Sequence, residues 1–146
     1  MITYPRIREQ TRWRALLLCS LVLASSLASA ATPTVIKVEA KNGSYTYKAG
    51  GTVDIIVKFS TPVTVTTTGN APKLTLNSTT AGVAVDLWSG STTDELLFRY
   101  SVLAGHNVAV LDYKTTSSLT LPAGASIVAT TGGETAVLTL PTVGGA

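Results

Sequence analysis

Two segments of the chain alternate apolar and polar residues with a period of two. The first runs from Thr52 to Ser60 and the second from Glu95 to Val102. Successive side chains of a β-strand point to opposite faces, so each segment would present one apolar face and one more polar face. The apolar positions are Val53, Ile55, Val57 and Phe59 in the first segment, and Leu96, Phe98, Tyr100 and Val102 in the second. Both segments are therefore predicted to be half-buried strands.

Turn residues divide the chain after Ala31 into further short runs. Glycine stands beside asparagine or serine between the runs, as in Lys41-Asn42-Gly43. Threonine and valine are abundant, and their branched Cβ favours strands over helices. We predict strands at residues 34–40, 44–48, 52–59, 63–67, 72–77, 82–88, 94–103, 108–113, 117–121, 125–129 and 135–140, of which some short ones would merge or form loops. This spacing predicts a single all-β domain over residues 31–146, an antiparallel β-sandwich of about seven to nine strands.

The same alternation predicts the side chains of the core. Val137 and Leu138 are neighbours, so only one of them can face inward, and the period favours Leu138 together with Leu140. The other candidates are Ile36, Val38, Val53, Ile55, Val57, Phe59, Leu74, Leu76, Val85, Leu96, Phe98, Tyr100, Val102, Leu111, Tyr113, Leu119 and Leu121.

The first 30 residues have the three parts of a secretory signal peptide. Four arginines make the start basic, residues 15–27 form an apolar run, and Ala28-Ser29-Ala30 is a small-residue cleavage site before Ala31. The apolar run is shorter than the roughly 20 residues that a spanning helix needs. We therefore predict a helical signal peptide at residues 1–30, with an uncleaved membrane anchor as the alternative.

Cleavage would change the chemistry and the charge of the chain. The only cysteine, Cys19, would be lost, so the processed chain would form no disulfide. The net charge of +3 also comes from the leader, because seven basic residues face seven acidic ones from Ala31 onward. A neutral domain lacks the basic surface that nucleic acids require. We expect no nucleic-acid partner, and contact with a membrane only during export.

Several short pieces of the chain, taken in order, are similar to a known repeat. They are NGSYTYKAGGTVDIIVKFSTPVTV at 42–65, PKLTLN at 72–77, WSGSTTDELLFRYSVLAGHN at 88–107, VLDY at 110–113, SLTL at 118–121 and AVLTLP at 136–141. In this order they resemble a repeat of long bacterial surface and secreted proteins. The resemblance implies an immunoglobulin-like or cadherin-like sandwich, which usually occurs in tandem copies, whereas this chain holds one copy.

Related sandwiches bind calcium through loop acids, but this chain departs from that pattern. The family usually has acids at the positions of His106 and Val110, and this chain keeps only Asp94, Glu95 and Asp112 as candidates. Calcium takes six to eight oxygen ligands, so we expect no cofactor, with calcium as the alternative. The carboxylate of Asp112 is expected to accept backbone N–H bonds in a turn.

The candidate catalytic residues do not form a recognisable motif. His106 is the only histidine, and its place in a Gly-His-Asn turn indicates a solvated side chain. Asp94 and Glu95 are neighbours on a predicted strand, so their carboxylates would point to opposite faces and would not converge. We predict that the protein is not an enzyme.

Exposed aromatic residues are the remaining candidates for function. Tyr45 and Tyr47 are two apart and would share a face of a strand, and Trp88 precedes the Ser89-Gly90-Ser91 turn. We expect a structural or adhesive module at the bacterial cell surface or outside the cell, with the periplasm as a further location. Its partner would be a protein, bound by strand addition, or a glycan. The alternative is a carbohydrate-binding module that uses Trp88, Tyr45 and Tyr47.

Overall fold

The structure, a computed structural model, describes residues 31–43 and 45–144, and these residues form strands, turns and loops without a helix. The strands are β1 (Val35–Ala40), β2 (Thr52–Thr67), β3 (Lys73–Leu76), β4 (Val83–Ser89), β5 (Thr93–Ser101), β6 (Leu119–Thr120) and β7 (Ala125–Ala129). The prediction of an all-β fold is confirmed. The predicted signal peptide and its cleavage site at Ala28, Ala30 and Ala31 lie almost wholly outside the described residues, and only Ala31 is among them.

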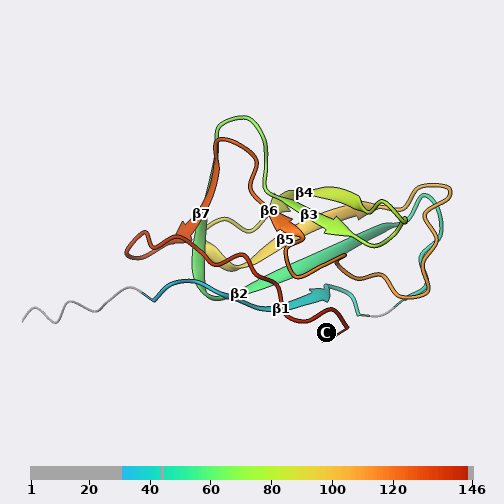
Figure 1. The fold of residues 1–146 in the computed structure, drawn as a ribbon, viewed down its shortest axis with the longest axis horizontal. Coiled ribbons are helices and arrows are strands. Elements are labelled where there is room, and N and C mark those ends of the chain that lie inside the picture. The colour runs from blue at the N-terminus through green and yellow to red at the C-terminus, as the bar shows by residue number, and fades with distance from the viewer. Residues whose placement is uncertain (1–30, 44, 145–146) are drawn as a thin grey trace, which may run out of the picture.

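All seven strands belong to one curled antiparallel sheet (Figure 1). The order is β1-β2-β5-β4-β3-β6, and β7 pairs with the second part of β2. Residues 52–58 of β2 pair with β5, and residues 63–67 pair with β7. The register shifts between these two parts, and such a β-bulge bends a strand and increases its twist. The predicted strands at 52–59 and 63–67 are therefore one bent strand that joins two parts of the sheet.

One hydrophobic cluster fills the inside of the curled sheet. Its largest buried side chains include Phe59 on β2, Phe98 on β5 and Leu74 on β3. The predicted core is largely confirmed, since these residues are buried: Val38, Val53, Ile55, Val57, Phe59, Leu74, Leu76, Val85, Leu96, Phe98, Tyr100, Val102, Tyr113, Leu119 and Leu140. Leu111, Leu121 and Leu138 are partly buried and pack against the cluster.

The prediction for Ile36 is wrong, because a bulge changes the phase of β1. Val35 lies opposite Phe59 of β2, but Lys37 lies opposite Lys58, so one residue of β1 is extra. Val35 and Val38 both face the core as a result, whereas Ile36 is 54% exposed. Residues on both sides of a bulge do not follow the strict alternation that the sequence pattern assumes.

Three predicted strands are absent among the described residues. Residues 45–48 and 108–112 are irregular, and Tyr113 makes a single bridge to Leu76 of β3. Residues 135–140 make only isolated bridges, because this segment contacts two neighbours briefly. Thr135 bridges to β7, while the next bridge, at Val137, is a parallel one to Thr34. Val137 is 44% exposed, whereas Leu138 and Leu140 pack inward, as the period of the sequence predicted.

Within residues 31–43 and 45–144, the chain has no helix of the length and apolar character that would cross a bilayer.

Candidate functional site

Trp88 lies on the outer face of the sheet beside Arg99. The guanidinium carbon of Arg99, on β5, lies 4.4 Å from the centre of the Trp88 ring, on β4. The guanidinium also binds the carboxylate of Asp54 on β2 through Nε and Nη2, at 2.7 and 3.0 Å. Trp88 is nevertheless 62% exposed, so the face of its indole that Arg99 does not cover is open to solvent. This group of an exposed ring, a cation and a carboxylate offers stacking and hydrogen bonding at one place on the surface.

The electrostatics of this group follow from the pairing of Arg99 with Asp54. The hydrogen bonds from Arg99 lower the pKa of Asp54 below its ordinary value; partial burial opposes this shift, and the charges of Arg99 and Lys41 add to it. The same hydrogen bonds raise the pKa of Arg99. Both side chains are therefore charged at neutral pH and form a bidentate, charge-assisted pair.

Tyr45 and Tyr47 lie at a second place, in the loop that follows β1. Tyr45 is 68% exposed, whereas Tyr47 packs against the core. Their ring centres are 6.4 Å apart and the ring planes meet at 84°, an edge-to-face contact. The prediction that the two rings share one strand face is wrong, because residues 45–48 do not form a strand. The two rings form a corner in place of a flat platform.

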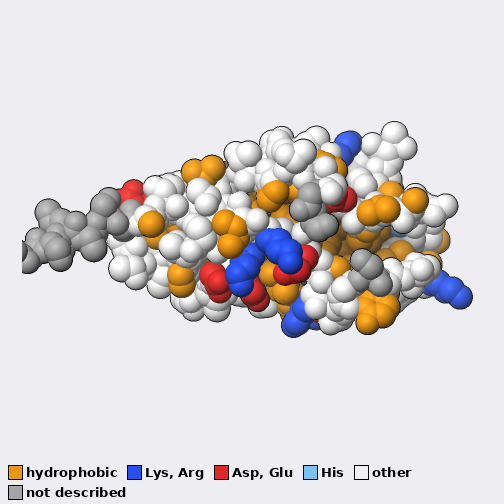
Figure 2. All heavy atoms as spheres, turned by 90° about the horizontal axis from the view of Figure 1, so that it is seen from below, with side chains coloured by type: hydrophobic (Ala, Val, Ile, Leu, Met, Phe, Trp, Pro, Cys, Tyr) orange, Lys and Arg blue, Asp and Glu red, His pale blue; other side chains and the backbone are white. Residues whose placement is uncertain are grey.

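Both tyrosines line a hollow between β1 and the loop that leads to Tyr113. The hollow has a volume of about 500 Å³, and its apolar floor includes Val38, Val53, Ile55, Leu76 and Tyr113. Figure 2 shows hydrophobic side chains in a hollowed part of the face seen from below, next to a group of acidic and basic side chains. Trp88 does not line this hollow, so the structure does not bring the three predicted aromatic residues into one site.

β1 borders the hollow with an unpaired strand edge. Lys41 donates its backbone N–H to the carbonyl of Asp54, and in the same register Glu39 faces Ile56 and Lys37 faces Lys58. Hydrogen-bonded and non-hydrogen-bonded pairs alternate in an antiparallel ladder, so the backbone groups of Val38 and the N–H of Ala40 point away from β2. Among the described residues, no strand pairs with this side of β1, and the C-terminal segment meets the chain just before the strand, where Val137 bridges to Thr34.

Lys37 and Glu39 flank Val38 on the solvent face of β1. Their side chains form an ion pair of 2.6 Å, and each is about half exposed, at 49% and 41%. Two residues that are two apart in a strand point to the same face, which is why they meet.

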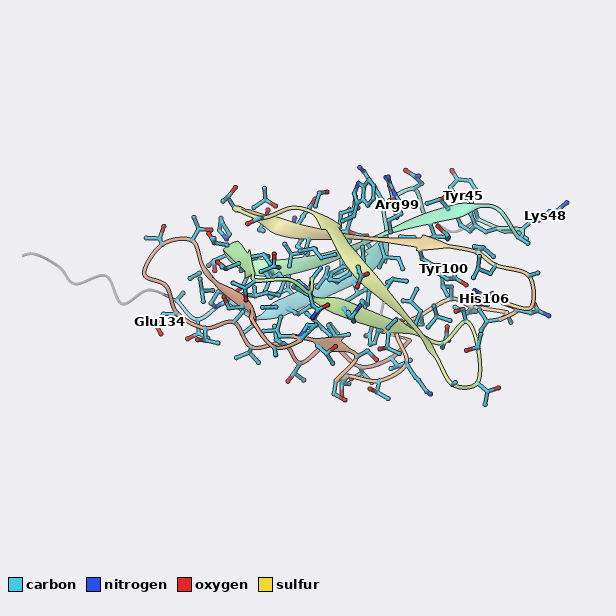
Figure 3. All side chains as sticks on the ribbon, turned by 90° about the horizontal axis from the view of Figure 1, so that it is seen from above. Tyr45, Lys48, Arg99, Tyr100, His106 and Glu134 are labelled. Carbon is cyan, nitrogen blue, oxygen red and sulfur yellow. The ribbon has the colours of Figure 1, made fainter. Side chains whose placement is uncertain are left out.

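The side chain of His106 is partly buried, although its place in a turn predicts a solvated side chain. Its backbone N–H donates to the carbonyl of Leu103, so the turn is present, but its ring stacks on buried Tyr100 with 5.8 Å between ring centres. The hydroxyl of Tyr100 lies 2.8 Å from Nδ1 of His106. Figure 3 shows these two side chains pointing toward one another at the end of the molecule opposite Glu134. The contact fixes the loop after β5.

Asp94 and Glu95 do converge, contrary to the prediction. Nζ of Lys58 lies 2.8 Å from Glu95 and 3.4 Å from Asp94. Asp94 lies where the register between β2 and β5 shifts, so its side chain does not follow the alternation of the rest of β5. The hydrogen bond with Glu95 and then the charge of Asp94 raise the pKa of Lys58. Both carboxylates share one exposed cation, which is an arrangement typical of a solvated surface pair.

Asp112 binds the backbone, as the sequence indicated. Its carboxylate oxygens accept the N–H groups of Tyr113, at 2.7 Å, and Gly144, at 2.9 Å. The hydroxyl of Tyr113 donates to the carbonyls of Pro141 and Thr142 at 2.9 and 3.1 Å. Burial, with a smaller contribution from the charge of Asp112, raises the pKa of Tyr113. The segment before Gly144 is thus held from two sides.

The carboxylates that the sequence offers as calcium ligands bind different partners. Asp94 and Glu95 bind Lys58, while Asp112 binds the C-terminal segment. In the described part of the chain, no three side chains of the metal-ligating types come together.

Comparison of the chain with protein-family models, with curated proteins and with solved structures finds no match.

The alternation pattern missed two features of the surface. Asp54 and Arg99 occupy the polar positions of the two segments that alternate most regularly, but their contact depends on the register between β2 and β5, where they are direct partners. The unpaired edge of β1 was equally hidden, because a strand's neighbours are set by the rest of the fold. The signal that was present was a pair of opposite charges, Lys37 and Glu39, on one face of a predicted strand.

Proposed function

We propose that this chain is an exported, non-enzymatic β-sandwich module with a structural or adhesive role at the bacterial cell surface or outside the cell. The observation that carries the proposal is that the charged and polar side chains bind partners within the protein. Asp54 binds Arg99, Lys58 binds Asp94 and Glu95, Lys73 binds Asp86, Asp112 binds the backbone and His106 binds Tyr100. The groups with acid–base chemistry thus stabilise the fold, while an open strand edge and exposed aromatic rings face solvent.

An immunoglobulin-like sandwich is the arrangement of the sheet that we favour. Two parts of the curled sheet, β1-β2-β5 and β3-β6, contribute side chains to the same core cluster. The bridge between Thr34 and Val137 is parallel, whereas every strand pair is antiparallel. A first strand that meets the last segment of the chain in parallel is compatible with closing a sandwich at its edge. The resemblance to extracellular bacterial repeats supports the same arrangement.

Export is tested by determining where the native chain begins and where it accumulates. The full gene is expressed in its host, and the protein is recovered from cytoplasm, envelope and medium. We expect mass spectrometry to find an N-terminus at Ala31 in the envelope or medium fraction, because Ala28 and Ala30 form the cleavage site. A protein that keeps residues 1–30 and stays in the cytoplasm would contradict the proposed function.

The adhesive role is tested by deleting the gene and measuring attachment and cell–cell aggregation. We expect a loss of attachment that is restored by the wild-type gene. A deletion strain with unchanged attachment and an unchanged envelope would argue against any adhesive or structural role.

Turnover of a substrate by the purified protein would contradict the non-enzymatic assignment, and His106→Ala would then show whether the histidine participates.

Carbohydrate binding is the second candidate, and the exposure of Trp88 favours it. Sugars stack on aromatic faces, and the guanidinium and carboxylate of Arg99 and Asp54 lie beside the ring to bind hydroxyl groups. The other tryptophan, Trp13, belongs to the predicted leader, so Trp88 would be the sole tryptophan of the processed chain. Its fluorescence would then report directly on glycan binding.

The test is a glycan array followed by fluorescence titration of the positive sugars. We expect Trp88→Ala to abolish binding and Trp88→Phe to retain part of it, since a smaller ring still stacks. Tyr45→Ala is the matched control, because Tyr45 is equally exposed but lies at the hollow. Binding that disappears in Tyr45→Ala and persists in Trp88→Ala would place the sugar at the hollow; an empty array would remove this candidate.

A further inference from the structure

We propose that two copies of this chain associate through antiparallel pairing of their β1 strands, centred on Val38. The inference deepens the proposed adhesive or structural function, on which it rests, by naming a second copy of the chain as the partner. It is carried by three features of β1: an edge that is unpaired around Val38 and Ala40, a self-complementary pair of charges and open space beside the strand.

The first feature is the direction of the free backbone groups. The N–H and C=O of Val38 point away from β2, and so does the N–H of Ala40. The carbonyl of Ala40 already accepts the N–H of Gly43 at 3.1 Å. When two β1 strands meet with Val38 opposite Val38, both residues present a donor and an acceptor to each other. Two hydrogen bonds then form at the centre of the interface without breaking a bond within either copy.

The second feature is the order of charges along the strand. Lys37 and Glu39 stand one residue before and one residue after Val38 on the solvent face. In an antiparallel pair centred on Val38, Lys37 lies opposite Glu39 of the second copy, and Glu39 lies opposite its Lys37. Side chains directly opposite in such a pair are about 5 Å apart at Cβ, so both contacts are between opposite charges. Four alternating charges replace the two isolated pairs, and the same patch serves both copies, as two-fold symmetry requires.

The third feature is the hollow beside the edge. It is lined by Val38 and Ala40 on one side and by residues 109–113 and Gly144 on the other, and its volume of about 500 Å³ is open space beside the edge of the strand. Ile36, 54% exposed, would lie opposite Ala40 of the second copy and add apolar contact at each end of the interface.

Charge reversal distinguishes this interface from any other. Lys37→Glu places two glutamates opposite two glutamates, and Glu39→Lys places two lysines opposite two lysines, so each variant alone repels itself. An equal mixture of the two variants restores both opposite-charge contacts between unlike copies. The double variant Lys37→Glu with Glu39→Lys restores them between like copies.

The measurement is analytical ultracentrifugation of the protein purified after expression of the full gene, over a concentration series reaching about 1 mM. We expect wild type to reach twice the mass of the monomer, and each single variant to raise the dimer dissociation constant at least about tenfold. The mixture and the double variant should return to the wild-type constant. Lys48→Glu and Glu134→Lys are the matched controls, because they make the same changes of charge outside β1 and should leave the dimer intact.

Ala40→Pro tests the backbone part of the interface independently of charge. The N–H that proline removes faces the open edge, so no hydrogen bond to β2 is lost, and proline is tolerated at such positions of edge strands. We expect this variant to be a folded monomer by circular dichroism and sedimentation.

A wild-type protein that is monomeric throughout the series would overturn the proposal, as would single charge variants that dimerise like wild type. An exported monomer would contradict this inference alone, whereas a cytoplasmic dimer would contradict only the proposed function.

Discussion

Arg99 and Asp54 are direct partners across β2 and β5 and bind each other through two hydrogen bonds of 2.7 and 3.0 Å. The pairing lowers the pKa of Asp54, so the folded protein holds this carboxylate ionised to lower pH than the unfolded chain does. A lowered pKa in the folded state contributes stability above the unfolded value of about 3.9. That contribution is lost as the pH falls through the folded pKa.

We therefore expect Asp54→Asn to lower Tm by about 1–3 °C at pH 7, a small effect because solvent reaches the pair. The difference from wild type should close as the pH falls through the lowered pKa of Asp54 in the folded state, below which the carboxylate is protonated in both states. Calorimetry at a series of pH values measures the gap. A gap that stays constant down to that pH would show that the loss in the variant is one of packing.

Phe98→Ala should destabilise the protein by about 3–5 kcal/mol. Phe98 is fully buried at the centre of the sheet, opposite Ile55 on one side and Leu87 on the other, so truncation leaves a cavity. Urea denaturation gives the free energy of unfolding. Leu97→Ala, on the opposite face of the same strand, is the control and should cost clearly less. Equal losses in the two variants would mean that the core lies elsewhere.

Alternation predicted β2 and β5 well because both strands are long and regular, and each buries one face. The same rule failed at Ile36, where one extra residue in β1 reverses the phase. It also failed at residues 108–112, which have strand-forming side chains but bind Asn77 instead of a neighbouring strand. Asn77 donates its side-chain amide to the carbonyl of Val110 and accepts the N–H of Asp112. When a side chain takes the backbone hydrogen bonds that a neighbouring strand would make, the alternation of apolar and polar residues in the sequence does not reveal it.

The surface was less predictable than the core for a related reason. Exposure of Trp88 followed from its place before a turn, which is local information. Its contact with Arg99, and the failure of Trp88 to join Tyr45, depend on which strands become neighbours. Strand order arises from pairing between residues far apart in sequence, and one sequence read for local pattern does not contain it.

Gly90→Ala should destabilise the hairpin between β4 and β5 by at least about 2 kcal/mol. Gly90 has a φ of 113°, and a Cβ there would lie 2.1 Å from the carbonyl oxygen of Glu95. Gly105 is the matched control, since its φ of 83° is also positive but no atom lies within 4 Å of the added Cβ. Gly105→Ala should cost about 1 kcal/mol, the backbone strain alone. Thermal unfolding of both variants measures the difference, and equal costs would contradict the steric argument.

Removal of metal should leave the stability unchanged. The acids Asp94 and Glu95 bind Lys58, and Asp112 binds backbone N–H groups, so each carboxylate already has a partner within the protein. We expect the same Tm in excess chelator and in millimolar calcium. A bound ligand would raise the free energy of unfolding with its concentration, so a rise of several degrees in calcium would establish a site and contradict this prediction.

Asp112 and Tyr113 act on the same C-terminal segment, so their effects should not add. Asp112→Ala removes the acceptor of the Gly144 N–H, and Tyr113→Phe removes the donor to the carbonyls of Pro141 and Thr142. Each loss should cost about 1–2 kcal/mol. Once either bond is gone the segment detaches more readily, and the second substitution then has less left to break. We expect a double variant whose destabilisation is smaller than the sum by about 0.5 kcal/mol or more.

Limited proteolysis locates that effect, because a detached segment is cleaved before the core unfolds. Cleavage near residue 141 should be faster in each single variant than in wild type, and Asp86→Asn, which alters an exposed ion pair with Lys73, should not change it. Since Asp112, Tyr113 and Gly144 also line the hollow beside β1, loosening the segment alters the space at the unpaired edge. Strictly additive energies with unchanged cleavage would mean that the two side chains stabilise separate parts of the fold.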